Sequence, residues 1–571
     1  MNAVLARARR AAPVAFAAAV LVGATVDSFR TWYPHGDLAV FGFRLDDLAS
    51  HPPLVGAYSR YGWSHPGPLL YYALWAPYQA VGGGARGLLV ATLCWHALGA
   101  AACLWFAGRR GGLPLQATTA IVVVLTAVVA GGDALLQPWN PFLNFTIVPL
   151  FVLASWSMVE GDRWGPVAAV VSGTALVQNH LGLAVPVFAV AAVAVATTVA
   201  RRRRLDVGWR WWAAAFGAGV VAWAPPLLQI QRADPDNLNR VMDFFSDRGD
   251  GAGLRVAIRL GAQTLGLQAA WLGVTPATAW LEGGLEPRSG LAAWPVLGLV
   301  PLAALVVSIR SRRWDRMRLL LLGATLVASG TLATASITDA VFPYLLNWLD
   351  VASAAFVLTG AWVLAADLAP RLAPSRLLAH RDLVATGVVG VASMTLTALL
   401  IVAPDPYEDR GPVFAELTRG ALATLGPTPG TVVFAASPPG QDFAVTGVMY
   451  QLERRGWTTY ADPFYANMLG TWRVRTPTAS DVRVLMVAES GSIDKLARDP
   501  KWRRIAYYQP FTAEELRRLT ELDTKIAAEH DDPSKKYEVL GALDELLKIR
   551  RGRTRVALYE RLDPTATAPS L

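Results

Sequence analysis

Long apolar runs separated by short clusters of arginine are the feature that most constrains this chain. Each run approaches the roughly 20 residues that an α-helix needs to cross a bilayer. Only 17% of the residues are charged, compared with roughly 25% in ordinary soluble domains. The sequence therefore predicts an α-helical polytopic membrane protein with about eleven transmembrane helices, at about residues 12–28, 87–107, 114–131, 142–158, 164–180, 182–200, 209–228, 291–309, 318–336, 343–367 and 382–402.

The arginine clusters predict how these helices are oriented. Cytoplasmic loops of membrane proteins carry an excess of lysine and arginine. With about eleven spans the N-terminus is cytoplasmic, the C-terminus lies outside, and every cluster falls inside, namely Arg109 and Arg110, residues 201–204, residues 310–318, and Arg371, Arg376 and Arg381. This topology accounts for the net charge of +9 without a nucleic-acid partner. The abundance of alanine and arginine is typical of high-GC bacteria, so we expect a multi-pass protein of a bacterial plasma membrane.

The count requires that the apolar stretch 68–81 does not span the membrane. This stretch is short and rich in tyrosine and tryptophan, which favours a helix lying at the headgroup level. A second candidate surface helix covers residues 37–49, where apolar residues recur at helical spacing. We therefore expect a first external loop with two juxtamembrane helices, and membrane lipids as partners of both.

The character of the sequence changes after Pro404, where charges appear throughout. Residues 431–436, 483–487 and 555–559 are expected to form strands, and residues 443–455 and 512–529 amphipathic helices. This pattern predicts two domains, a transmembrane domain at 1–403 and an extracytoplasmic α/β domain at 404–571. Residues 564–571 are expected to form a loose tail.

Candidate functional residues concentrate in the first external loop. Aromatic rings stack on sugars, arginine pairs with phosphate oxygens, and a carboxylate can take a proton from a hydroxyl group. The residue types are equally compatible with an interfacial belt of aromatic rings and solvated charges. The residues concerned are Asp37, Arg44, Asp46 and Asp47 on the first surface helix, and Tyr58, Arg60 and His65 before the second.

The order of motifs in this loop favours a functional site over an interfacial belt. Gly36-Asp37 follows the first span, then come Pro66-Gly67-Pro68 with Leu69 to Tyr72, Gly82 to Gly84, and Ala85 to Leu88 at the start of the next span. This order resembles the GT-C integral-membrane glycosyltransferases, the class that includes protein O-mannosyltransferases and aminoarabinose transferases. The chain departs from the class pattern where Leu38 follows Asp37, and where Gly67 interrupts the two prolines.

The resemblance implies an enzyme that uses a polyprenyl-phosphate sugar, with arabinose and mannose as natural candidates. Asp37 would be the general base that deprotonates an acceptor hydroxyl, and transfer would invert the anomeric carbon. The acceptor would be a glycan, lipid or protein of the cell envelope. The sequence requires no cofactor, and it leaves a divalent metal ion open.

Further residues are weaker candidates, each with a structural alternative. Asp46 and Asp47 could be acidic partners in the site or a solvated helix face. Arg44, Arg60, Arg232 and Arg240 could bind the donor phosphate or lipid headgroups, and His65 could bind substrate or cap a helix. Polar residues at the outer ends of spans could line the same cavity or form turns and caps; they are Trp139, Asn140, His180, Asp339, Asn347 and Asp350.

Two other functions fit a chain of this kind. A transporter or flippase of a lipid-linked precursor would usually show paired broken helices in matching halves, and the sequence shows no such pairing. A non-catalytic assembly factor of the cell envelope would tolerate loss of Asp37. That residue therefore discriminates between the hypotheses.

Overall fold

The computed structural model divides the chain into two units. It describes residues 2–27, 32–204, 207–232, 236–247, 249, 251–273, 284–288, 294–372, 375–403, 410–436, 442–478, 481, 483–489, 491–529, 535–550 and 553–563. Unit 1 comprises Met1–Thr31 and Arg44–Pro406, and unit 2 comprises Trp32–Phe43 and Tyr407–Leu571. The second unit thus includes twelve residues between α1 and α3, which the predicted boundary at residue 404 assigns to the transmembrane domain.

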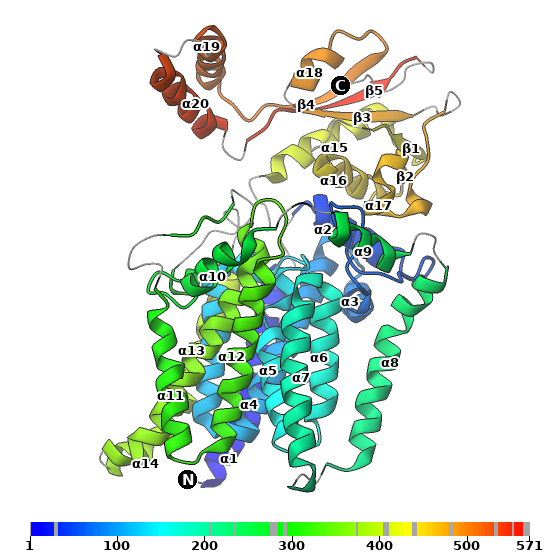
Figure 1. Ribbon diagram of the computed structural model, residues 1–571. Coiled ribbons are helices and arrows are strands. Elements are labelled where there is room, and N and C mark those ends of the chain that lie inside the picture. Colours follow the sequence, from blue (N-terminus) through cyan, green and yellow to red (C-terminus); the bar gives the residue numbers. More distant parts are fainter. Residues whose placement is uncertain are drawn as a thin grey trace. The chain divides into compact units, whose positions relative to one another are not determined.

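Unit 1 is a bundle of long apolar helices (Figure 1). A helix lies over each of the predicted apolar runs, and seven helices of the described residues are long and apolar enough to cross a membrane. The protein is therefore an integral membrane protein of the predicted helical class. The helices that cover the predicted runs are α1 (Asn2–Asp27), α4 (Gly84–Ala130), α5 (Ile147–Val159), α6 (Gly165–Asn179), α7 (Ala184–Arg201), α8 (Trp209–Arg232), α11 (Leu299–Arg310), α12 (Trp314–Thr334), α13 (Pro343–Leu372) and α14 (Ser375–Val402).

Helix α4 carries two of the predicted runs. Gly112 interrupts it with a left-handed backbone, at a φ of +67°, and Pro114 follows two residues later. A residue with a Cβ atom rarely adopts this conformation. The kink therefore divides α4 into two successive helices.

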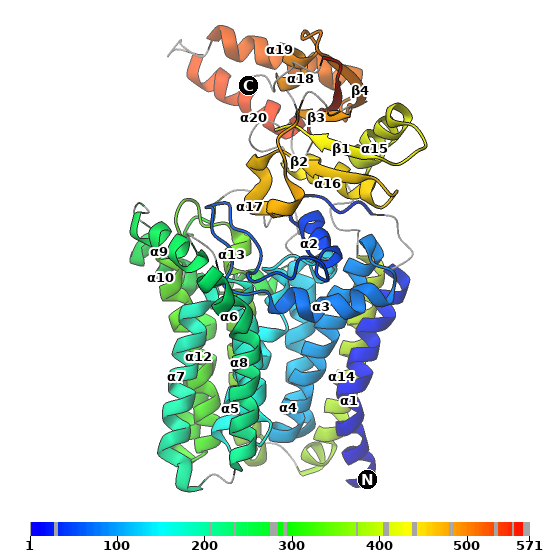
Figure 2. The same ribbon diagram turned by 90° about the vertical axis from the view of Figure 1, so that its right-hand side faces the viewer.

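Short helices lie at the end of the bundle away from the N-terminus. In Figures 1 and 2, α9 (Asn237–Asp247) and α10 (Gly253–Gln263) lie at that end. Helix α3 (Leu69–Ala80) covers the predicted second surface helix, and its 12 residues are fewer than the roughly 20 that a span needs. The short 3₁₀ segments of unit 1 are Gly132–Leu135, Phe142–Asn144, Leu181–Leu183, Arg202–Arg204, Ala270–Leu272 and Val296–Gly298.

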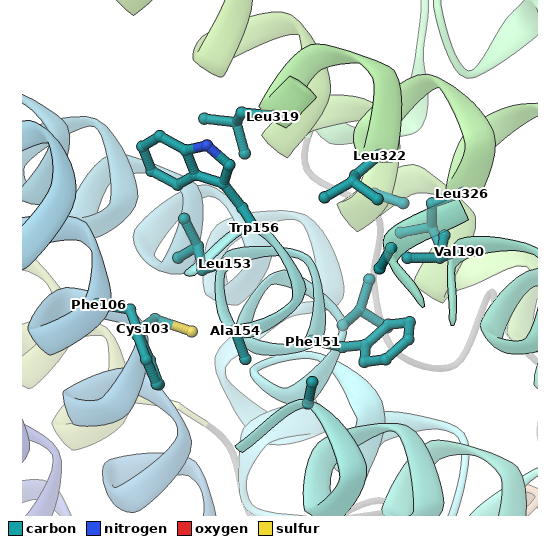
Figure 3. Packing of buried hydrophobic residues seen from close by; sticks show 14 of the residues in the cluster. Cys103, Phe106, Phe151, Leu153, Ala154, Trp156, Val190, Leu319, Leu322 and Leu326 are labelled. Atoms are coloured by element: carbon teal, nitrogen blue, oxygen red, sulfur yellow. The ribbon is translucent and has the colours of Figure 1, made fainter. Parts of the chain in front are cut away.

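The centre of the bundle is packed with large apolar side chains (Figure 3). Trp156 and Phe151 of α5 lie among Leu319 and Leu322 of α12, and all four are almost completely buried. Helices within a membrane associate through such close packing, because the lipid around them is equally apolar. This core fixes the helices against one another.

Ion pairs tie the helices at the end that carries the arginine clusters. Arg318 donates from Nε and Nη2 to the two carboxylate oxygens of Glu160, which also lies 3.0 Å from Arg201. Asp162 lies 2.7 Å from Arg109. Buried pairs of this kind fix register rather than add much net stability.

Unit 2 contains a small mixed sheet with helices on its faces, as the sequence predicts. The strands are β1 (Thr431–Phe434), β2 (Thr458–Ala461), β3 (Val484–Glu489), β4 (Trp502–Tyr508) and β5 (Val556–Arg561), in the order β2-β1-β3-β5-β4. Strand β1 is parallel to β2 and β3, and β5 is antiparallel to β3 and β4. The helices are α15 (Gly411–Leu425), α16 (Asp442–Glu453), α17 (Ala466–Leu469), α18 (Gly491–Leu496), α19 (Ala513–Glu529) and α20 (Lys536–Arg550), with 3₁₀ turns at Pro463–Tyr465 and Thr471–Arg473. The expected tail, 564–571, lies outside the described residues.

Helix α2 (Gly36–Asp46) covers the predicted first surface helix, and its residues up to Phe43 belong to unit 2. His35 stacks on Phe414 with ring centroids 4.6 Å apart. Phe43 meets the edge of Tyr450 at 5.4 Å, and the guanidinium of Arg473 lies 4.3 Å from the centre of the Phe43 ring. These contacts make the segment part of the hydrophobic packing of unit 2.

Candidate functional site

The proposed base lies in the first turn of α2. Gly36 begins the helix with a φ of +52°, a backbone conformation that favours glycine. Asp37 follows with an exposed side chain, and Arg44 lies in the last turn. A carboxylate at the start of a helix and a cation at its end both match the helix dipole. Asp37 is therefore a solvent-accessible carboxylate on a well-defined helix.

Asp46, at the end of α2, has a structural role within unit 1. The buried hydroxyl of Tyr78 donates a hydrogen bond to Asp46 Oδ1 at 2.7 Å and accepts one from the backbone N–H of Gly84 at 3.0 Å. This relay ties the end of α2 to α3 and to the start of α4. Asp47 is half-buried, and its carbonyl accepts the N–H groups of Ser50 and His51.

Arg60 is held beside Asp339 by a shared tyrosine. The guanidinium donates to the hydroxyl of Tyr61 at 2.7 Å, and that hydroxyl donates to Asp339 Oδ2 at 2.7 Å. The Arg60 side chain is 49% exposed and lies 3.5 Å from the same carboxylate oxygen. Asp339 has a φ of +63°, which is uncommon for a residue other than glycine. The result is an oriented cation that still reaches solvent.

His65 is buried against His180. The two ring centroids lie 4.9 Å apart, and the backbone N–H of Leu181 donates to His65 Nδ1 at 3.1 Å. Burial, with His180 alongside, holds the pKa of His65 well below its ordinary value. At neutral pH the ring is uncharged with its proton on Nε2, so it can donate one hydrogen bond but offers no charge to a phosphate.

Amide groups form a buried network beside the first residues of α5 and the last residue of α6. Asn140 donates to the carbonyl of Asn179, and Asn179 donates to the carbonyl of Asn140 and to the Asn144 side chain. Trp139, next to this network, packs 4.9 Å from Tyr344, measured between ring centroids. The predicted pair Trp139 and Asn140 therefore lies inside the protein rather than at the interface.

These groups join into one circuit of contacts, all within unit 1. Arg60 lies 5.4 Å from the ring of Phe342, which stacks on Tyr344 at 5.8 Å. On the other side, Phe244 of α9 touches both Tyr61 and Trp63. We call the following set the contact circuit: Arg60, Tyr61, Trp63, His65, Trp139, Asn140, Asn179, His180, Phe244, Phe342 and Tyr344.

Other predicted residues lie elsewhere. Arg232 ends α8 and Arg240 lies on α9; both are exposed, and within the described residues neither forms an ion pair. Tyr58 is half-buried and forms a short antiparallel bridge with Ser64. None of the three is part of the contact circuit, and Asp37 belongs to the other unit.

The structure adds residues to the predicted set. Phe244, Phe342 and Tyr344 are single aromatic residues in the sequence, and no local signal distinguishes them from others. The predicted residues Asn347 and Asp350 are both buried; Asn347 lies one turn beyond Tyr344 on α13, and Asp350 lies one turn beyond Asn347. In the described part of the chain the Asn347 amide has no hydrogen-bond partner. Polar groups at this depth usually face a cavity or another helix.

Among the described residues, no group of three or more histidine, cysteine, aspartate or glutamate side chains is arranged to hold a metal ion. A divalent ion stays an open prediction, because ligands can also come from substrate phosphates.

The chain resembles solved structures, whereas comparisons of its sequence found no match. No family model matches the chain, and no curated protein matches its sequence. Two structures of ArnT from Cupriavidus metallidurans, one bound to undecaprenyl phosphate and one in the apo state, superpose with a TM-score of 0.54. The match covers 86% of this chain and 95% of ArnT at 15% sequence identity.

The chain has the GT-C fold. The resemblance predicted from the loop motifs is thereby confirmed for the architecture. The arabinofuranosyltransferase AftD from Mycobacteria was also found, with a TM-score of 0.34 and 15% identity over 89% of this chain and 38% of AftD.

Proposed function

We propose that this GT-C protein is a glycosyltransferase that uses a polyprenyl-phosphate sugar. The observation that carries the proposal is the match to ArnT over 86% of this chain, since ArnT has been solved with undecaprenyl phosphate bound. The acceptor is a hydroxyl group of an envelope glycan, lipid or protein. Arabinose and mannose are both candidates for the sugar of the donor.

In the proposed reaction Asp37 takes the proton of the acceptor hydroxyl. The oxygen forms a bond to the anomeric carbon of the donor from the side opposite the phosphate. The bond between that carbon and the phosphate oxygen breaks, and polyprenyl phosphate leaves with the electron pair. One displacement of this kind inverts the anomeric configuration.

Residues of unit 1 would bind the donor. Arg60 is the strongest candidate for the phosphate, because Tyr61 and Asp339 hold its guanidinium while it stays half exposed. His65 and His180 would contribute hydrogen bonds to hydroxyl groups, with Trp139 and Asn140 supporting them from inside. Arg44, Arg232 and Arg240 are weaker candidates for the phosphate, and Tyr58 for stacking on the sugar.

The orientation follows from the arginine clusters. We propose that the N-terminus is cytoplasmic and that catalysis and unit 2 lie on the outer side of a bacterial plasma membrane. Unit 2 would then position the acceptor. A lipid-anchored donor explains why such an enzyme needs a membrane domain.

The test is turnover of radiolabelled polyprenyl-phosphate sugars by the full-length protein in lipid. We expect release of polyprenyl phosphate by the native protein, and a loss of at least 100-fold in Asp37→Asn, in line with removal of a general base. Asp243→Asn serves as the matched control, because Asp243 is an exposed carboxylate on α9 outside the contact circuit. Full turnover by Asp37→Asn would remove Asp37 from the mechanism and leave Asp47 to be tested. Donor that crosses the bilayer without being consumed would identify a flippase instead.

A further inference from the structure

A polar cavity lies in unit 1, at the end of the bundle where α1 begins. Its volume is about 590 Å³, within the range of about 300–1,000 Å³ that is usual for ligand sites. The start of α1, the Gly112 kink of α4, and the ends of α12, α13 and α14 surround it. The kink and the helix ends leave space there that regular helices would fill.

This cavity is distinct from the contact circuit. Tyr344 of the circuit lies in the first turn of α13, whereas Ala369 of the cavity lies near its last turn. A continuous helix separates these residues by roughly 37 Å at about 1.5 Å per residue. The two groups of residues therefore face opposite surfaces of the membrane.

The polar lining of the cavity is predominantly cationic. It comprises four arginines, Arg9, Arg110, Arg316 and Arg381, and two aspartates, Asp315 and Asp382. Arg381 lies 3.6 Å from Asp382, and both side chains reach solvent. Arg9 is exposed, and within the described residues it forms no ion pair. The lining thus has two more arginines than aspartates, and Arg9 at its rim is an exposed cation that an anion could approach.

Two of the arginines are held in place by the bundle. Arg110 donates to the carbonyl of Ser157 at 2.8 Å and lies 4.0 Å from Asp162, while its buried Nε–H has no partner in the described part of the chain. Arg316 pairs with Asp367 and lies 5.5 Å from the centre of the Trp362 ring. Pre-oriented guanidinium groups bind phosphate oxygens at a low cost in conformational entropy.

The rest of the lining is apolar. Leu5, Leu113 and Trp362 line the cavity together with alanines of α13. A soluble anion would make no favourable contact with these apolar side chains, whereas the glycerol and acyl chains of a lipid would pack against them. Basic pockets between transmembrane helices bind anionic headgroups in this way.

We propose that this cavity binds the phosphate of an anionic phospholipid at the membrane surface that the arginine clusters assign to the cytoplasm. Arg110 and Arg316 contact the phosphate from inside, and Arg9 and Arg381 close the rim. The bound lipid bridges α1, α4, α12, α13 and α14, so it belongs to the structure of the bundle. This site does not depend on the proposed glycosyl transfer.

Native mass spectrometry of the full-length protein, released from nanodiscs, tests the site. With nanodiscs of phosphatidylglycerol and phosphatidylcholine we expect selective retention of phosphatidylglycerol. The double variant Arg9→Gln/Arg381→Gln leaves the buried arginines intact and should still fold, and it should retain the lipid about 30-fold less, because each surface cation contributes about 1 kcal/mol. Arg7→Gln, an exposed change on the same helix outside the cavity, should retain it fully.

Three outcomes would overturn the assignment. Equal retention of both lipids, or equal retention by all variants, would show that the cavity does not select an anionic headgroup. Displacement of the lipid by millimolar inorganic phosphate would show that a soluble anion is the ligand. The variant Arg110→Gln should also lose the lipid. Its thermal melt, measured with and without phosphatidylglycerol, distinguishes loss of lipid binding from misfolding.

Discussion

His65 and His180 lie with their ring centroids 4.9 Å apart and connect two loops that are distant in the sequence. The loop before α3 is joined to the loop after α6, because Leu181 donates its N–H to the His65 ring. Both histidines are therefore part of the framework of the contact circuit as well as candidates for substrate binding.

Replacement of His65 by phenylalanine should lower stability. The ring contact would survive, but the buried N–H of Leu181 would lose its acceptor, at a cost of about 1–3 kcal/mol. His65→Asn places an amide oxygen near the position of Nδ1 and should recover most of that loss. Thermal unfolding in detergent measures both changes. Equal melting temperatures for the native protein and His65→Phe would show that this hydrogen bond contributes nothing.

Acidification should destabilise unit 2 through His35. Burial lowers the pKa of His35 to about 3, and Nδ1 donates to the carbonyl of Tyr33 at 2.9 Å. The unfolded chain takes up a proton near pH 6.5, whereas the folded unit does not do so until about pH 3. The contribution of His35 is therefore complete above pH 6.5 and declines between pH 6.5 and 3, by up to about 1.4 kcal/mol per unit.

Pulse proteolysis in urea at pH 7.5 and pH 5 measures this effect on unit 2 in the full-length protein. Between these two values the native protein should lose about 2 kcal/mol more than His35→Gln, which cannot titrate. If the two proteins lose the same stability, His35 is not the group responsible.

Substitution of Gly67 by alanine should disrupt the turn before α3. A Cβ atom at this position would overlap the side chain of Gln178, which accepts the N–H of Leu69 at 3.1 Å and donates to the carbonyl of Ala222 at 2.7 Å. Gln178 cannot move without breaking both bonds, so we expect a loss of about 2 kcal/mol or more.

Gly217→Ala is the matched control for this substitution. Gly217 lies within α8 and has no atoms near the position of a Cβ, so alanine should be neutral or stabilise the helix by about 0.5–1 kcal/mol. The melting temperatures of the two variants decide the point. If Gly67→Ala and Gly217→Ala have the same melting temperature, the proposed steric restriction is contradicted.

Much of the fold could be predicted because its information is local. A run of apolar residues specifies a span by its length, and the arginines that separate the runs indicate their sides. The first surface helix was predicted at 37–49 and lies at Gly36–Asp46, and the second was predicted at 68–81 and lies at Leu69–Ala80. In unit 2, β3 and β5 stand out as apolar runs, whereas β2 has four residues and β4 contains Arg503 and Arg504, so neither shows a strand pattern.

The candidate site depended on contacts that no local pattern contains. Asp37, Arg60 and His65 are visible as polar residues in one loop, but the partners of Arg60 and His65 come from elsewhere. Asp339 lies before α13, and His180 lies after α6. Asp46 stays a predicted acidic partner, and only the structure shows that its carboxylate accepts a hydrogen bond from Tyr78.

The sequence by itself determined the membrane-spanning class, the approximate number of spans and the two surface helices, because each depends on the hydropathy of neighbouring residues. Only the tertiary structure decided that Trp32–Phe43 packs with unit 2, that His65 is buried and neutral, and that Arg110 and Arg316 line a cavity. The physical reason is that burial and pairing depend on atoms supplied by distant segments, and these come together only when the helices pack.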